Sequence, residues 1–252
     1  MFPYRDENET QRPAVVAGTI VVLNVLTWIV VQGAGAAIPL ARSVCELGLI
    51  PGALTASLPP GTRFPVGEGL VCTIDPGRQI SHIFTSMFLH GSWVHLLGNM
   101  WFLWLFGNNV EDSMGRLRFI IFYLLSGLAA AAGQVLTSPE SAIPMVGASG
   151  AISGVMGGYL MLYPNVRVYT LVPIGFFITS IALPAWVMLG YWLLIQFISG
   201  LLSSGEVGGV AFWAHVSGFV TGMVLVKLFV RSDYMAGRQQ RVWRPRRILG
   251  GF

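Results

Sequence analysis

Charged residues are scarce in this chain of 252 residues. Asp, Glu, Lys and Arg make up 10% of it, whereas they make up about 25% of an ordinary soluble domain. Hydrophobic residues make up 54%, and the mean hydropathy is +0.67. So few charges could not cover the surface of a water-soluble protein, and so many apolar residues do not fit a disordered chain. The composition excludes both classes and predicts a polytopic membrane protein.

The formal net charge of +4 does not indicate a nucleic-acid-binding protein. The basic residues lie at the chain ends and in short loops, and no folded polar domain could present them to nucleic acid. We expect contact with the anionic headgroups of the lipid bilayer instead. For the basic tail from Arg238 to Arg247, a solvated tail is an equally good interpretation.

Patterns of metal sites, aspartate proteases and transporters are absent. The chain has four His and no His-Glu-x-x-His. His90 and His95 are five residues apart and would face different sides of a helix, so no metal site is predicted. No Asp, Glu or Arg lies in the core of an expected span, which argues against a two-aspartate membrane protease. No internal repeat supports a small-solute transporter, which is the weakest alternative.

Six segments have the apolar character of membrane-spanning helices. The expected spans are residues 14–31, 93–106, 117–136, 149–162, a fifth from about 184, and 210–230. The first is too long for the core of a signal peptide, and we expect it to be retained. The predicted fold is therefore all-α, a six-transmembrane-helix bundle.

Two connecting stretches are unusual. Residues 33–92 form a long outer loop rich in Pro and Gly, which we expect to be partly embedded through amphipathic pieces at 45–50 and 83–89. Pro173 and Pro184 interrupt the apolar run that begins at residue 170, which indicates a partly embedded connector before the fifth span.

The distribution of arginine predicts the orientation of the bundle. The short loops 137–148 and 203–209 contain no Lys or Arg, whereas every Arg outside the long loop falls on the opposite side. Both termini are therefore expected in the cytoplasm. The chain divides into an N-terminal cytoplasmic segment (1–13), a membrane domain (14–230) and a basic cytoplasmic tail (231–252).

Both cysteines of the chain, Cys45 and Cys72, fall in the long outer loop. An oxidising exterior permits a disulfide between them. Two unpaired thiols buried at the membrane interface are an equally good interpretation, because the sequence does not give their geometry.

Polar residues at membrane depth are costly and usually functional. The expected spans contain His95 and Asn99 in the second, Ser149 and Ser153 in the fourth, and His215 in the sixth. These three spans run in the same direction, and His95, Ser149 and His215 each lie near the outer start of their helix. At a rise of about 1.5 Å per residue, the three side chains should lie at nearly the same depth.

These residue types favour acyl-transfer chemistry. Ser149 stands in Gly147-Ala148-Ser149-Gly150 at the start of a helix, and a Ser hydroxyl becomes a nucleophile when a base such as His215 takes its proton. His95 and Asn99 are four residues apart on one helix face. With the Ser149 backbone N–H they could hold an oxyanion.

A Ser-His dyad is the default form of such a site. No carboxylate is expected at this depth, so a Ser-His-Asp-type triad would need Glu140 or Glu206 from an outer loop. Each polar residue taken alone also has a structural interpretation. Gly150, Gly154 and Gly158 repeat every four residues as a helix-packing face that could include Ser149. The catalytic interpretation depends on the shared depth and complementary roles of the residues.

Taken together, these motifs resemble the rhomboid intramembrane serine proteases. The resemblance covers roughly residues 78–230 and includes further short motifs. The matching residues are Gly147-Ala148-Ser149-Gly150, His95-x-x-x-Asn99, Ala214-His215-x-x-Gly218, Phe88-Leu89-His90-Gly91 and Glu111-x-x-x-Gly115.

The resemblance implies that Ser149 is the nucleophile and His215 the base, with His95, Asn99 and the Ser149 amide at the oxyanion site. It implies cleavage of transmembrane-anchored protein substrates near the outer membrane face, without a cofactor. The fifth span would correspond to the family's proposed substrate gate. We expect a bacterial plasma membrane, and a water-accessible polar cavity between the second, fourth and sixth spans.

This chain departs from the family pattern at two places. Ser81-His82 stands where many members have Trp-Arg, so that loop anchor differs. Ser153 stands where many have an aromatic residue packed against the base, so His215 must be held differently, and a hydrogen bond is one way. The alternative function is a non-catalytic rhomboid-like protein that binds client membrane helices.

Overall fold

The structure is a computed structural model that describes residues 1–66, 70–74, 79–175, 177–203 and 210–235. Its long helices overlap the apolar segments. They are α1 (Val15–Val30), α5 (Trp93–Met114), α6 (Arg116–Thr137), α7 (Ser149–Leu162), α8 (Ala185–Leu202) and α9 (Phe212–Phe229). Among the described residues, α6, α8 and α9 are long and apolar enough to cross a membrane, and α1 and α7 are shorter apolar helices.

Helix α5 extends further than the sequence predicted. We expected its span to end at residue 106, but the helix continues to Met114 and ends at Gly115, which has φ +81°. The extra turns carry two buried carboxylates. Glu111 accepts hydrogen bonds from the backbone N–H groups of Val16 (3.0 Å) and Ala17 (2.8 Å), which lie in the first turn of α1. The end of α5 is polar because it caps another helix, where anions are favoured.

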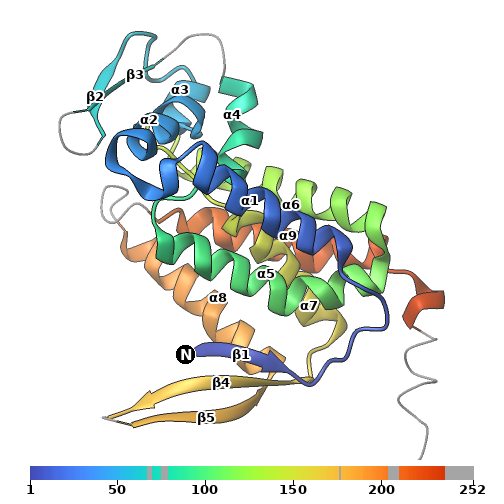
Figure 1. Cartoon of the computed structure of the whole chain (residues 1–252). Helices are drawn as coiled ribbons and strands as arrows, with labels where there is room; N and C mark the ends of the chain where they lie inside the picture. Colours follow the sequence, from blue (N-terminus) through green and yellow to red (C-terminus); the bar gives the residue numbers. More distant parts are fainter. Residues whose placement is uncertain (67–69, 75–78, 176, 204–209, 236–252) are drawn as a thin grey trace, which may run out of the picture.

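Helix α7 lies inside the bundle and contacts α5, α6, α8 and α9 (Figure 1). Small residues allow this close packing. A Cβ at Gly218 of α9 would overlap the backbone oxygen of Gly150 of α7, and a Cβ at Gly222 would overlap the backbone oxygen of Gly154. The two helix backbones therefore touch over two successive turns.

The all-α prediction is wrong in one region, because a three-stranded sheet lies beside the bundle (Figure 1). Strands β4 (Arg167–Ile174) and β5 (Phe177–Pro184) form an antiparallel hairpin, and β1 (Phe2–Asp6) pairs with β4. The hairpin occupies the segment that we expected to be a partly embedded connector. It is rich in β-branched and aromatic residues, which favour strands.

Strand β1 is also fixed to the helices. The Asp6 carboxylate accepts hydrogen bonds from the Tyr159 hydroxyl of α7 (2.6 Å) and from Asn109 Nδ2 of α5 (3.0 Å). The Trp101 indole N–H donates to the backbone oxygen of Pro3 at 2.7 Å. The N-terminal segment therefore packs as part of the domain.

The long loop folds into short elements on the opposite side of the bundle from the sheet (Figure 1). They are η1 (Gly33–Gly35), α2 (Ala37–Leu47), α3 (Pro51–Leu54), β2 (Arg63–Pro65), β3 (Val71–Thr73), α4 (Gln79–Thr85) and η2 (Ser86–Phe88). The expected amphipathic piece at 45–50 begins in α2 and extends past its end. The piece at 83–89 is divided between α4 and η2. A disulfide joins Cys45 of α2 to Cys72 of β3, with a Cα–Cα distance of 5.5 Å.

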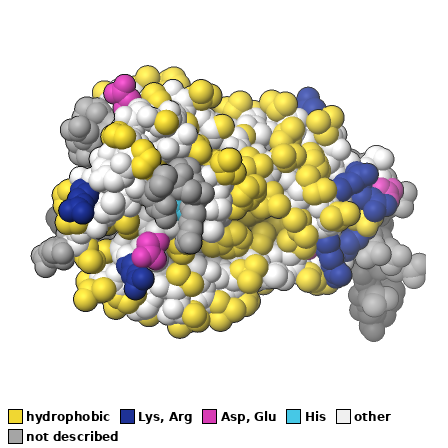
Figure 2. All heavy atoms as spheres, turned by 90° about the horizontal axis from the view of Figure 1, so that it is seen from above, with side chains coloured by type: hydrophobic (Ala, Val, Ile, Leu, Met, Phe, Trp, Pro, Cys, Tyr) yellow, Lys and Arg dark blue, Asp and Glu magenta, His cyan; other side chains and the backbone are white. Residues whose placement is uncertain are grey.

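Hydrophobic side chains cover the middle of the face in Figure 2, and the charged side chains gather towards the two ends. This distribution suits a bundle with both ends in water and its middle in lipid. Residues 236–252, which include most of the expected basic tail, and Glu206 lie outside the described residues.

The contact between α7 and α9 can be tested with two glycines. Gly222→Ala should lower the free energy of unfolding by about 1–3 kcal/mol, because the new Cβ has no room against Gly154. Gly190→Ala on α8 is the matched control, since its Cβ would have no neighbour within 4 Å. The control should be neutral or gain about 0.5–1 kcal/mol from helix propensity. Unfolding in detergent measures the stability of both variants. Equal stabilities would contradict the close packing of α7 against α9.

Candidate active site

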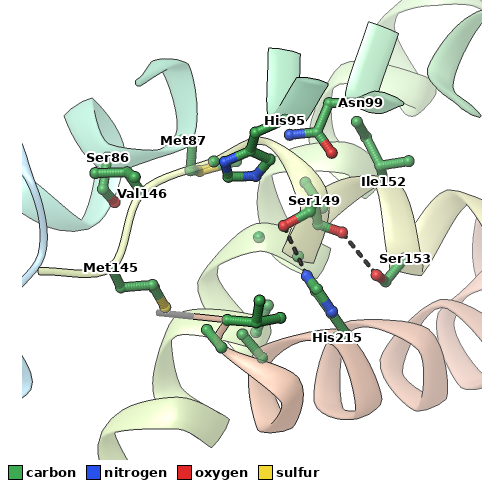
Figure 3. A pocket seen from close by; sticks show the side chains of 18 of the residues that line it. Ser86, Met87, His95, Asn99, Met145, Val146, Ser149, Ile152, Ser153 and His215 are labelled. Atoms are coloured by element: carbon green, nitrogen blue, oxygen red, sulfur yellow. Dashed lines mark hydrogen bonds between the residues drawn. The ribbon is translucent and has the colours of Figure 1, made fainter. Parts of the chain in front are cut away.

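Ser149 and His215 lie next to each other at the starts of α7 and α9. Ser149 Oγ and His215 Nε2 are 2.8 Å apart in a hydrogen bond (Figure 3). The close approach of Gly150 and Gly218, one residue after Ser149 and three after His215, brings these two helix turns together. The packing face and the dyad that the sequence suggested are therefore parts of one arrangement.

The other side of His215 faces α8. Its Nδ1 is 2.8 Å from Gln196 Oε1, and its ring lies 5.8 Å from the Trp192 ring, centroid to centroid. Neither residue was among the candidates from sequence. Ser153 does not hold His215, because its hydroxyl donates to the backbone oxygen of Ser149 at 2.6 Å (Figure 3). The signal missed in the sequence was Gln196 itself, an amide within an apolar span.

His95 lies in the first turn of α5, where the Ser92 side chain caps the helix by accepting the His95 backbone N–H at 3.1 Å. The Gly91 backbone N–H donates to His95 Nδ1 at 3.3 Å. In the neutral imidazole, Nε2 then carries the proton and can donate. Figure 3 shows His95 and Asn99 on the Ser149 side of α5.

Asn99 presents a second donor at this side of the site. The residue is 8% exposed, and its Nδ2 has no hydrogen-bond partner within the described structure. A buried donor without a partner is costly. Such a group is suited to bind an acceptor that enters from outside the protein.

Gly147 allows the loop before α7 to pass close to His95. Its φ is +128°, and a Cβ there would lie 2.7 Å from His95 Nε2. Its backbone N–H donates to the oxygen of Ser86 at 2.9 Å. Glycine is required at this position for both its conformation and the space.

His90 supports the site from the preceding loop. Its ring meets the His95 ring edge to face with centroids 5.1 Å apart. Burial, with a smaller contribution from His95, lowers the pKa of His90 to about 3, so this ring stays neutral. Its backbone N–H donates to Gln32 Oε1 and its backbone oxygen accepts from Gln32 Nε2, both at 2.8 Å. Gln32 therefore clamps the loop that precedes α5.

One cavity of about 550 Å³ lies between α5, α6, α7, α8 and α9, and its lining includes Ser149, His215, His95, Asn99, Gln196 and Trp192. We expected a polar cavity, but much of its lining is apolar or small. That part of the lining includes Met87, Phe102, Gly127, Ala130, Ala131 and Met156. No carboxylate lines it among the described residues, and Glu140 is exposed elsewhere. Nor do the described residues contain a cluster of three His, Cys, Asp or Glu able to hold a metal ion.

The fold and the cavity define a helical membrane domain with a paired Ser and His. A model of the rhomboid domain matches residues 77–232, more than half of the chain, and the chain belongs to the rhomboid family. With its apolar helices, this membership indicates an integral membrane protein.

Several named proteins are similar to this chain. RHOMBOID-like protein 4 of Arabidopsis thaliana is 33% identical over 63% of this chain and 36% of its own length. Rhomboid protease GluP of Bacillus subtilis is 33% identical over 51% of this chain and 24% of its own length. Putative rhomboid protease YdcA of Bacillus subtilis is 38% identical over 32% of this chain and 40% of its own length. The match spans less than half of each of these relatives.

The Gln32 clamp can be tested by stability. Gln32→Leu should lower the free energy of unfolding by about 1–3 kcal/mol for each group of His90 that it leaves buried without a partner. Thr19→Val is the control, because the Thr19 hydroxyl is exposed and bonds only to its own helix. The control should change stability by less than about 0.5 kcal/mol. Similar losses in both variants would show that the hydrogen bonds of Gln32 do not stabilise the fold.

Proposed function

We propose that this protein is an intramembrane serine endopeptidase that cleaves transmembrane-anchored protein substrates near the outer membrane face. The observation that carries the proposal is the hydrogen bond between Ser149 Oγ and His215 Nε2 at the wall of a cavity within the bundle. Membership of a family whose relatives include named proteases supports it. A binding protein for client helices would need the small-residue faces but not this pair.

The arrangement of the side chains supports the following reaction. Ser149 Oγ attacks the carbonyl carbon of the peptide bond while His215 Nε2 takes the hydroxyl proton. The carbonyl oxygen of the tetrahedral intermediate accepts hydrogen bonds from His95 Nε2, Asn99 Nδ2 and the Ser149 amide. His215 then gives its proton to the leaving amine, and water hydrolyses the acyl-enzyme.

The proposed topology has six spans, with both termini in the cytoplasm and the Ser-His pair near the outer face. Substrate helices would enter from the side, with α8 as the gate. The bacterial plasma membrane stays a prediction from sequence. The relatives include proteins named for the chloroplast and the mitochondrion, and their identity to this chain is similar to that of the Bacillus relative.

Removal of the nucleophile tests the proposal. Ser149→Ala should abolish both cleavage of a membrane-anchored reporter and covalent labelling by a serine-directed fluorophosphonate. Ser126→Ala is the control, because Ser126 is buried in the bundle outside the cavity and its hydroxyl has no partner in the described structure. The control should cleave the reporter and be labelled like the wild type. An unlabelled, inactive wild type would favour the client-binding alternative.

Removal of one oxyanion donor tests the second half of the site. Asn99→Ala should lower kcat by roughly 10²–10³-fold, as is typical when one such donor is lost. KM should change little, because the donor acts mainly on the transition state. Steady-state kinetics in proteoliposomes measure both constants. An unchanged kcat would remove Asn99 from the oxyanion site.

A further inference from the structure

Helix α8 supplies two contacts to the side of His215 that faces away from Ser149. Gln196 Oε1 lies 2.8 Å from Nδ1, and the Trp192 ring packs against the imidazole at 5.8 Å. The two residues are four apart, so they project from the same face of the helix. Trp192 also stacks on Phe219, one turn after His215, with centroids 6.0 Å apart.

The contact with Gln196 Oε1 favours one tautomer of His215. An amide oxygen only accepts hydrogen bonds, so Nδ1 must donate to it. In the neutral ring, Nε2 is then unprotonated and accepts the Ser149 hydroxyl proton. This is the tautomer that a general base needs, because the opposite tautomer would present an N–H to Ser149.

The position of Gln196 in α8 also points to a role for its side chain. The residues on either side of it, Ile195 and Phe197, are exposed apolar side chains. An amide in such a helix is expensive at membrane depth and usually has a reason. The contact with His215 supplies that reason.

We propose that Gln196 is the positioning residue of the site, which holds His215 in the Nδ1–H tautomer and aims Nε2 at Ser149. Gln196 acts through His215 and does not touch the reacting atoms. Trp192 completes the arrangement by limiting rotation of the ring. Together they take the place of the aromatic residue that many rhomboids have at the position of Ser153. The catalytic part of this inference depends on the proposed function, and the tautomer does not.

The tautomer can be measured directly. The chain has four His, so ¹⁵N-histidine labelling of the full chain in bilayers gives few signals, and a His215→Ala variant assigns the signal of His215 by difference. The wild type should show a protonated Nδ1 and an unprotonated, hydrogen-bonded Nε2. The opposite tautomer in the wild type would overturn the proposal without any activity measurement.

Three variants on α8 test the role in catalysis. Gln196→Leu removes the acceptor and should lower kcat by roughly 10- to 100-fold with KM little changed, which is the range seen when the hydrogen-bond partner that orients a metal-bound His is lost. Its His215 signal should become a mixture of tautomers. Gln196→Glu keeps an acceptor oxygen and should retain both the tautomer and most of the activity. Tyr191→Phe is the control, because it removes a polar group from α8 outside the cavity.

The outcomes separate this inference from the proposed function. A Gln196→Leu protein with wild-type kcat and a single Nδ1–H tautomer would overturn it. Equal losses in Gln196→Leu, Gln196→Glu and Tyr191→Phe would also overturn it, because α8 would then matter only for folding. If the wild type cleaves nothing, the proposed function fails, and the tautomers of the wild type and of the Gln196→Leu variant still decide what Gln196 does.

Discussion

The close contact between α7 and α9 is the constraint on which the site depends. Where Gly218 meets the backbone of Gly150, a single methyl group would force the helices apart. Ser149 and His215 lie on the first turns of these helices, and the hydrogen bond between them requires the helices to stay at this distance. In the sequence, the stripe of glycines and the Ser-His pair were separate features. In this protein the first makes the second possible.

The close approach of Ser149 and His215 could be predicted because depth in a membrane follows from the order and direction of the spans. A helix that starts at Ser149 and one that starts near His215 place both side chains at one level, whatever the lateral packing. Gln196 could not be found in this way. Its contact depends on which face α8 turns towards α9, and a helix that is apolar on all sides does not indicate its inner face.

The sheet and the end of α5 were missed for a different reason. The β4–β5 hairpin is mostly apolar, so its composition fits an embedded segment as well as a strand. Its partner β1 lies at the start of the sequence, far from the hairpin, and no local pattern predicts that pairing. A charged residue such as Glu111 suggests a loop after an apolar span. Its place in the helix is explained by its partners, which are backbone N–H groups of α1.

Most of the α8 surface near Gln196 faces outward, and the helix still supplies both contacts that orient His215. The surrounding lipid and the imidazole therefore act on the same rigid element. A bilayer of different thickness or stiffness that shifts or tilts α8 would lengthen the hydrogen bond between Gln196 and His215. In the proposed reaction this would change turnover, although Ser149 and His215 themselves are unaltered. For the proposed protease, lipid composition then becomes a kinetic variable, separate from its effect on the substrate.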